Sequence, residues 1–219
     1  MTLAISDVPG NLPREIGSGP TVPDLTSEAD ARAVLDRYAI EPPAAGWSET
    51  VLDVPGEFQV VASTWTAMEA AAEEAERLGY EPFVAGEYVG EARDAARRHA
   101  ALALQMGKRA ALISGGELTV AVSGPGRGGR NQEFALASAM ELAGTSMEGV
   151  AADTDGIDGS GGAAGAYFDG STLARSSRDA GEALAANDSG GFFAALGDTF
   201  VTGPTGTNVS DLRVLLTGP

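Results

Sequence analysis

Two arginines inside a glycine-rich segment are the residues with the clearest chemical potential. The segment SGPGRGGR, residues 123–130, contains four glycines together with Arg127 and Arg130. Glycine lets the oxygen atoms of a ligand come close to the backbone, and arginine presents a planar, permanently charged group that suits carboxylate or phosphate. The pattern predicts an anion-binding site, with a tight turn carrying two solvated arginines as the alternative.

The flanking segments favour the anion-binding interpretation. An apolar run, Leu118–Val122, is typical of a buried strand, and a helix-compatible run, Asn131–Leu142, follows the glycines. Unpaired backbone N–H groups at a helix N-terminus carry partial positive charge and attract anions. Gly128, Gly129 and Asn131 are therefore expected to lie beside the bound anion.

A second loop carries three carboxylates within six residues. It is DTDGIDGSGGAAG, residues 153–165, with Asp153, Asp155 and Asp158. Asp155 and Asp158 suit a magnesium ion shared with a nucleotide phosphate, because Mg²⁺ needs only one or two protein carboxylates. The alternative is that these aspartates cap turns and helices.

A third polar loop, TGPTGTN at residues 202–208, offers hydroxyl, amide and N–H groups, including those of Thr205 and Asn208, but no charge. It can wrap a phosphate or simply turn the chain. All three loops sit beside predicted strands, and ligands of α/β folds gather outside strand ends. We therefore expect Arg130, Asp155 and Asn208 to meet at one site.

Strands and helices alternate along the chain, which predicts a layered α/β fold with a mixed sheet. Besides Leu118–Val122 we expect strands at Leu3–Val8, Phe58–Ala62, Pro82–Ala85, Arg109–Ser114, Gly149–Ala152 and Leu212–Leu216. Besides Asn131–Leu142 we expect helices at Ser27–Tyr38, Trp65–Leu78, Glu91–Met106, Thr172–Ala180 and Ser189–Leu196. A tight turn at Gly115-Gly116 is predicted to join its two flanking strands as an antiparallel hairpin.

Composition excludes several classes of function. The formal net charge is −17 with one lysine, Lys108, so nucleic-acid binding is not expected. The absence of cysteine excludes thiol catalysis and a Cys-ligated zinc site. A Ser-His-Asp triad would need His99, which lies in an alanine-rich helical run and is expected at the surface or the core edge. No apolar stretch is long enough to span a membrane and no signal-peptide pattern precedes the first motif, so we expect a soluble, cytoplasmic protein.

Several long motifs in the same order resemble one family. SGGELTVAVSGPGRGGRNQEFALA, DTDGIDGSGGAAGAYFDGST, NDSGGFF and TGPTGTNVSDLRVLL resemble the C-terminal MOFRL domain of type-II glycerate kinases. LAISDVPG and IGSGPTVPD resemble the end of that family's N-terminal, Rossmann-like half. The resemblance implies that residues 1–107 are the trailing part of the N-terminal domain and that residues 108–219 are the MOFRL domain.

Members of this family phosphorylate D-glycerate at its 2-hydroxyl with ATP and a divalent metal, so the resemblance implies ATP and Mg²⁺ as cofactors. It places the arginine of GGRNQE, Arg130, and the aspartate of ISDV, Asp7, at the active site. Asp7 is then a candidate to orient or deprotonate the substrate hydroxyl. Arg130 is a candidate to hold either the glycerate carboxylate or the transferring phosphoryl group.

The resemblance covers Leu3–Leu216 but only about the C-terminal half of the family's usual length. We therefore expect the isolated chain to turn over little, and to need an N-terminal half or to self-associate. Two departures weaken the metal assignment: Asn11 stands where the family has an acidic residue, and glycines stand at 161–162 where it has Thr- and Asp-type side chains.

Two other interpretations remain open. Gly124, Gly126 and Gly129 fit G-x-G-x-x-G, and Asp153 ends the next strand, as a dinucleotide-binding hydroxypyruvate reductase would require. The polar run RNQE after Gly129 weakens this alternative, since helix–strand packing there would prefer small apolar residues. The other possibility is a folded fragment without catalytic activity.

Overall fold

The computed structural model describes residues 1–48 and 51–218, which divide into two compact units. The first unit comprises Met1–Ala4 and Gly10–Val61, and the second comprises Ile5–Pro9 and Ala62–Pro219. Residue 107 lies inside the second unit.

The first unit has little core of its own. Its elements are β1 (Thr2–Ile5), the 3₁₀ turn η1 (Ile16–Ser18), α1 (Glu28–Arg37) and β2 (Phe58–Ala62), and β1 pairs with β2 in a two-stranded sheet. Helix α1 begins at Ser27 in a capping box with Asp30. Among its described residues no hydrophobic side chain is buried. The unit therefore gains little hydrophobic stabilisation from its own packing.

The second unit is built on a six-stranded sheet with the order β3-β5-β10-β7-β8-β9. These strands are β3 (Glu81–Glu87), β5 (Ala110–Gly116), β7 (Glu148–Asp153), β8 (Gly165–Asp169), β9 (Thr199–Phe200) and β10 (Asp211–Leu216). The pair β3–β5 is parallel, whereas β10 runs antiparallel to both β5 and β7, and β7–β8 and β8–β9 are also antiparallel. The predicted layered α/β fold with a mixed sheet is confirmed.

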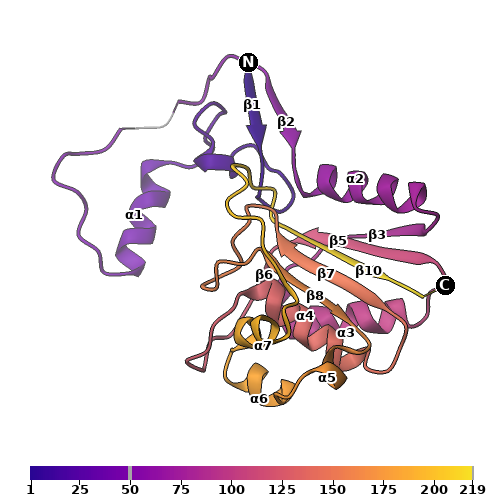
Figure 1. Ribbon diagram of the computed structural model, residues 1–219. Coiled ribbons are helices and arrows are strands. Elements are labelled where there is room, and N and C mark those ends of the chain that lie inside the picture. The colour runs from indigo at the N-terminus through magenta and orange to yellow at the C-terminus, as the bar shows by residue number, and fades with distance from the viewer. Residues whose placement is uncertain (49–50, 219) are drawn as a thin grey trace. The chain divides into compact units, whose positions relative to one another are not determined.

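Helices cover both faces of this sheet (Figure 1). They are α2 (Thr64–Arg77), α3 (Ala92–Ala103), α4 (Arg130–Glu141), α5 (Thr172–Arg175), α6 (Ala180–Ala185) and α7 (Ser189–Leu196). Ala111 and Ile113 of β5 pack with α2, while Leu112 between them packs with the cluster that contains α3 and α4. Successive side chains of a strand point to opposite faces, so this alternation places α2 opposite α3 and α4.

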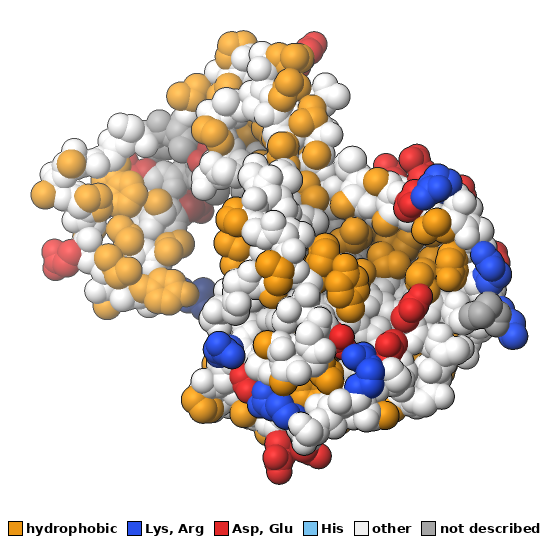
Figure 2. Space-filling view, viewed as in Figure 1, with side chains coloured by type: hydrophobic (Ala, Val, Ile, Leu, Met, Phe, Trp, Pro, Cys, Tyr) orange, Lys and Arg blue, Asp and Glu red, His pale blue; other side chains and the backbone are white. Residues whose placement is uncertain are grey.

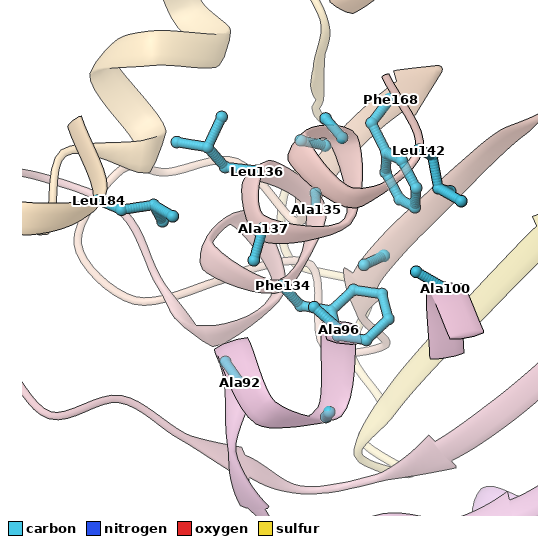
Figure 3. Packing of buried hydrophobic residues seen from close by; sticks show 14 of the residues in the cluster. Ala92, Ala96, Ala100, Phe134, Ala135, Leu136, Ala137, Leu142, Phe168 and Leu184 are labelled. Carbon is cyan, nitrogen blue, oxygen red and sulfur yellow. The ribbon is translucent and has the colours of Figure 1, made fainter. Parts of the chain in front are cut away.

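The main core lies where α3 meets α4 and the sheet. Figure 3 shows Ala96 and Ala100 of α3 beside the ring of Phe134 on α4, with Ala92 one turn earlier on α3. All four side chains are buried. Because alanine side chains are small, the two helices approach closely, and this packing fixes the position of the first turn of α4.

The predicted Gly115-Gly116 hairpin is wrong. Both glycines lie inside β5, and Leu118 instead pairs in parallel with Gly90, through β6 (Leu118–Thr119) and β4 (Gly90–Glu91), in a separate sheet. A Cβ on Gly115 would lie 2.0 Å from the Thr64 side chain, and one on Gly116 would lie 2.5 Å from a backbone oxygen. These glycines serve close packing, not a turn.

Two predicted elements are shorter in the structure. The strand expected at Leu118–Val122 keeps only its first two residues, and Val122 is exposed. The helix expected at Thr172–Ala180 is interrupted because Ser176 is extended. The Asp179 carboxylate then accepts the N–H of Glu182 at 2.8 Å and starts α6.

Candidate functional site

The first turn of α4 is capped by a carboxylate of the chain itself. Asp158 accepts the backbone N–H groups of Asn131 at 3.0 Å and Gln132 at 2.8 Å. A Cβ on Gly129 would lie 2.3 Å from an Asp158 oxygen, so glycine is what allows this approach. Burial raises the pKa of Asp158 to about 6, although both N–H bonds oppose the rise. Asp158 thus occupies the position that the sequence assigned to a bound anion.

Arg130 begins α4 and lies between three carboxylates. Its Nε donates to Asp211 at 2.9 Å, its Nη2 donates to Asp153 at 2.7 Å, and its Nη1 lies 3.2 Å from Glu117. Asp211 and Asp153 are buried, whereas Glu117 is exposed. Burial raises the pKa of Asp153 to about 7; the negative charge of Asp211 adds to this rise, and Arg130 opposes it. The guanidinium is therefore fixed in orientation and already neutralised.

A buried polar network holds Asp211 in place. Asp211 also accepts from the Asn131 side chain at 2.7 Å and from Arg213 Nη1 at 3.2 Å. Arg213 is fully buried, and its Nε donates to the Ser114 hydroxyl at 3.3 Å. Because Asp211 has several buried donors, its charge is compensated and it can anchor Arg130 firmly.

His99 is buried behind this network, which corrects the expected surface or core-edge position. Its Nδ1 lies 2.7 Å from the Ala95 carbonyl and its Nε2 lies 2.7 Å from the Ser114 hydroxyl. A carbonyl only accepts, so Nδ1 carries the proton and Nε2 accepts from Ser114. Burial lowers the pKa of His99 to about 4, so it is a neutral structural residue at physiological pH. Within the part of the chain that the structure describes, the hydrogen-bond partners of its ring are the Ala95 carbonyl and the Ser114 hydroxyl and include no carboxylate, so these residues do not form a Ser-His-Asp triad.

A solvent-open pocket of about 440 Å³ adjoins Arg130. Four of the predicted residues line it, namely Gly128, Gly129, Arg130 and Asp158. Its remaining walls come from Leu118, Val120, Val122, Gly126, Glu133, Gly159, Ser160 and Asn187. Arg127 is not among the lining residues; its backbone N–H bonds Asp188 at 3.0 Å and the residue is exposed.

The other predicted site residues form one hydrogen-bonded network with Arg130. Asn208 donates to the Asp7 carboxylate at 3.1 Å, and the backbone N–H of Thr205 bonds the Asp155 carbonyl at 2.9 Å. The Asp155 N–H in turn bonds Asp153, the partner of Arg130, at 3.1 Å. Thr154 connects this set to Asp7, because its carbonyl accepts from the Thr205 hydroxyl at 2.7 Å and its N–H bonds the Ser210 carbonyl at 3.0 Å, while the Ser210 hydroxyl donates to the Asp7 carbonyl at 2.7 Å. The network thus joins the start of β10, the end of β7 and the segment after β1. Thr205 and Asp7 are exposed, so Asp7 can meet a ligand from solvent.

Asp155 and Asp158 do not fit a magnesium site built by this chain alone. The Asp155 carboxylate accepts the N–H of Ile157 at 2.7 Å, and both Asp158 oxygens are used by α4. Across residues 1–48 and 51–218, no group of three His, Asp or Glu side chains could hold a metal ion. No helix in the described part of the chain is long and apolar enough to cross a membrane.

The glycines of the G-x-G-x-x-G pattern pack against the chain itself. A Cβ on Gly124 or Gly126 would lie 2.3 or 2.5 Å from the Ala186 carbonyl oxygen. Asn187 accepts the N–H groups of Ser123 at 2.8 Å and Gly124 at 2.9 Å. Strands β6 and β7, before and after α4, belong to different sheets. The βαβ unit that a dinucleotide fingerprint needs is therefore not formed.

Sequence reasoning missed three residues that build this region: Asp211, Asn187 and Glu133. Glu133 is buried, accepts from Arg93 Nε at 2.7 Å and from the Asn187 amide at 3.3 Å, and so ties α3 and the segment before α7 to α4. A signal for Asp211 exists, because it directly precedes the strand predicted at Leu212–Leu216 and lies two residues before Arg213, so that charged residues alternate with apolar ones there. Charges at alternate positions of a buried strand require buried partners.

Comparison with known proteins identifies the family. The MOFRL family matches residues 110–211, and a domain of unknown function, DUF4147, matches residues 1–73. A protein of Agrobacterium vitis named "Putative hydroxypyruvate reductase" is 44% identical over 100% of this chain and 55% of its own length. The D-glycerate 2-kinase of Thermotoga maritima is 37% identical over 98% of this chain and 55% of its own length.

A crystal structure of glycerate kinase from Thermotoga maritima has a TM-score of 0.93 to this chain at 36% identity. The match covers 98% of this chain and 56% of that one. The chain thus spans about half the length of the curated relatives it matches. Its fold is that of the matched half, and the chain belongs to the glycerate kinase family, since the glycerate kinase of Macaca fascicularis is also 30% identical over 100% of this chain and 72% of its own length.

Proposed function

We propose that this chain is the C-terminal part of an ATP-dependent glycerate 2-kinase that phosphorylates D-glycerate at its 2-hydroxyl. The observation that carries the proposal is the Arg130 cluster. It places one fixed arginine in a pocket wall and connects it, through Asp153 and a series of intervening hydrogen bonds, to the segment bearing Asp7. Phosphoryl transfer depends on positioning and fixed charge more than on covalent chemistry, and this arrangement favours the positioning of a substrate.

Asp7 is proposed to orient or deprotonate the substrate hydroxyl. Its carboxylate is exposed and is oriented by the Asn208 amide, while its backbone carbonyl accepts from the Ser210 hydroxyl at 2.7 Å. Arg130 is proposed to hold either the glycerate carboxylate or the transferring phosphoryl group with its oriented guanidinium. Further contacts to substrate or phosphate are proposed for Arg127, Gly128, Gly129, Asn131, Asp155, Thr205 and Asn208.

ATP and Mg²⁺ are proposed from family membership. The helix end that would suit a phosphate is capped by Asp158, and the one lysine, Lys108, is exposed and outside the pocket beside Arg130. Residues that the relatives carry outside the matched half are proposed to complete the nucleotide and metal sites. In this scheme residues 1–107 are proposed to belong with that other half and residues 108–219 to form the MOFRL domain.

A partner surface is part of the proposal. In the first unit Leu3, Val34 and Tyr38 are each more than half exposed. In the second unit, Figure 2 shows hydrophobic side chains gathered in a hollow beside α2, where Val150, Val214 and Leu216 line a pocket of about 360 Å³. Exposed apolar surface of this kind favours association, either with an N-terminal half or with a second copy.

A coupled ADP-release assay with D-glycerate and ATP tests the function. We expect little turnover by the chain alone and restored turnover when a separately expressed N-terminal half is added. A parallel arm with hydroxypyruvate and NADH tests the reductase named for the Agrobacterium relative; packing of Gly124 and Gly126 against Ala186 argues against it. NADH oxidation without ADP release would refute the kinase proposal.

A further inference from the structure

The donor groups of Arg130 have partners of very different exposure. Nε and Nη2 face Asp211 and Asp153, whose side chains are 0% and 5% exposed. Nη1 lies 3.2 Å from Glu117, whose side chain is 48% exposed. A buried carboxylate cannot leave without stranding charge in the interior, whereas an exposed one rehydrates at small cost. Nη1 is therefore the one position on Arg130 where a partner can be exchanged.

Arg130 lines the pocket of about 440 Å³, and so does Leu118, the residue after Glu117 in the chain, whereas Glu117 itself is not among the lining residues. A ligand in the pocket can reach Nη1 while Asp211 and Asp153 keep the guanidinium plane in place. Arg130 is thus held in one orientation by two buried carboxylates, while its Nη1 group is paired with the exposed carboxylate of Glu117.

The charges around the position select the incoming group. Asp153, Asp158 and Asp211 are all buried close by, and the Asn131 and Gln132 N–H groups of α4 are already used by Asp158. Replacing Glu117 with another single carboxylate leaves the local charge unchanged. A terminal phosphoryl group brings about two negative charges near pH 7 into the same surroundings without a free helix end to receive it.

We propose that Arg130 Nη1 binds the carboxylate of a small hydroxy acid by displacing Glu117, and that it does not bind the transferring phosphoryl group. The identity of the acid as D-glycerate rests on the proposed function. Glu117 is then a competing internal ligand that lowers the affinity of the free site. Hydroxypyruvate carries the same carboxylate, so the inference survives if the reaction is not phosphorylation.

Calorimetric titration of the full chain tests this directly, with D-glycerate and inorganic phosphate as separate probes in chloride-free buffer. Glu117→Gln removes the competing charge and is expected to tighten D-glycerate binding about two- to fivefold, the range for an exposed ion pair. Glu141→Gln is the matched control, because it removes the same charge at the exposed far end of α4, about 16 Å away. In the Glu117→Gln background, Arg130→Lys should abolish the gain in D-glycerate affinity, since lysine lacks the planar guanidinium group and its several N–H donors.

Three outcomes would overturn the inference. The first is an equal gain in D-glycerate affinity in Glu141→Gln, which would show that the effect reflects net charge alone. The second is a gain for phosphate that matches or exceeds the gain for D-glycerate. The third is no measurable D-glycerate binding by Glu117→Gln at tens of millimolar. These outcomes are independent of the ADP-release assay, so failure of the inference and failure of the kinase proposal can be told apart.

Discussion

The buried cap on α4 makes a specific prediction about pH and stability. Asp158 is 1% exposed, and burial raises its pKa from 3.8 to about 6. A carboxyl whose pKa is raised by folding contributes stability that is full below its unfolded pKa of 3.8 and is lost as pH rises through 6. A rise of this size corresponds to about 3 kcal/mol in total.

About 1.4 kcal/mol of this loss falls between pH 5 and pH 7.5. The chain carries little net charge near its sequence pI of about 4.2. The window from pH 5 to pH 7.5 stays above that value. Asp158→Asn removes the titration and keeps one acceptor oxygen for the helix. The stability advantage of the unsubstituted chain over Asp158→Asn is therefore expected to shrink by about 1.4 kcal/mol as pH rises from 5 to 7.5.

Urea unfolding followed by circular dichroism at several pH values measures this difference. Taking the difference between the two proteins cancels the titration of other groups, including that of Asp153. Asp188→Asn is the control, because Asp188 also bonds a backbone N–H but its pKa is lowered, chiefly by the Arg178 hydrogen bond. The stabilisation by Asp188 is already complete above pH 5. The difference in unfolding free energy between the unsubstituted chain and Asp188→Asn should therefore stay constant from pH 5 to 7.5. If the stability advantage of the unsubstituted chain over Asp158→Asn stays constant or grows as pH rises from 5 to 7.5, the reasoning is refuted.

Arg130→Ala leaves Asp153 and Asp211 without their shared cation, so we expect a loss of about 3–5 kcal/mol of unfolding free energy, seen as a lower Tm, together with loss of D-glycerate binding. A stability change within about 0.5 kcal/mol would show that the three charges are independent. Gly165→Ala would place a Cβ 1.8 Å from the Ala151 carbonyl oxygen, across the β7–β8 pair, and we expect poor soluble yield and a markedly lower Tm. Gly107→Ala, with nothing within 4 Å of the added carbon, is its control and should be close to neutral.

Local sequence patterns were sufficient to predict most of the helices and strands. Alternating apolar runs and alanine stripes correctly indicated an α/β fold, because these periodicities report directly on burial. The interrupted helix at Ser176 and the short β6 were missed, since tertiary packing decides where a locally acceptable element ends. Gly115 and Gly116 were misread for the same reason: a strand glycine and a turn glycine look alike until the neighbouring Thr64 and Tyr88 are placed.

For the site, the sequence by itself determined the residue types, the three glycine-rich loops and the family to which the motifs point. It placed Arg130 at the end of a glycine loop, directly before a helix expected from Asn131, and in the structure α4 begins at Arg130 itself. Only the tertiary structure decided how these groups are used. Asp158 is 28 residues from Arg130 in the chain and Asp211 is 81, yet one caps the helix and the other fixes the guanidinium. Electrostatic compensation depends on distance in space, so the charge state of this site was set by contacts that no local pattern contains.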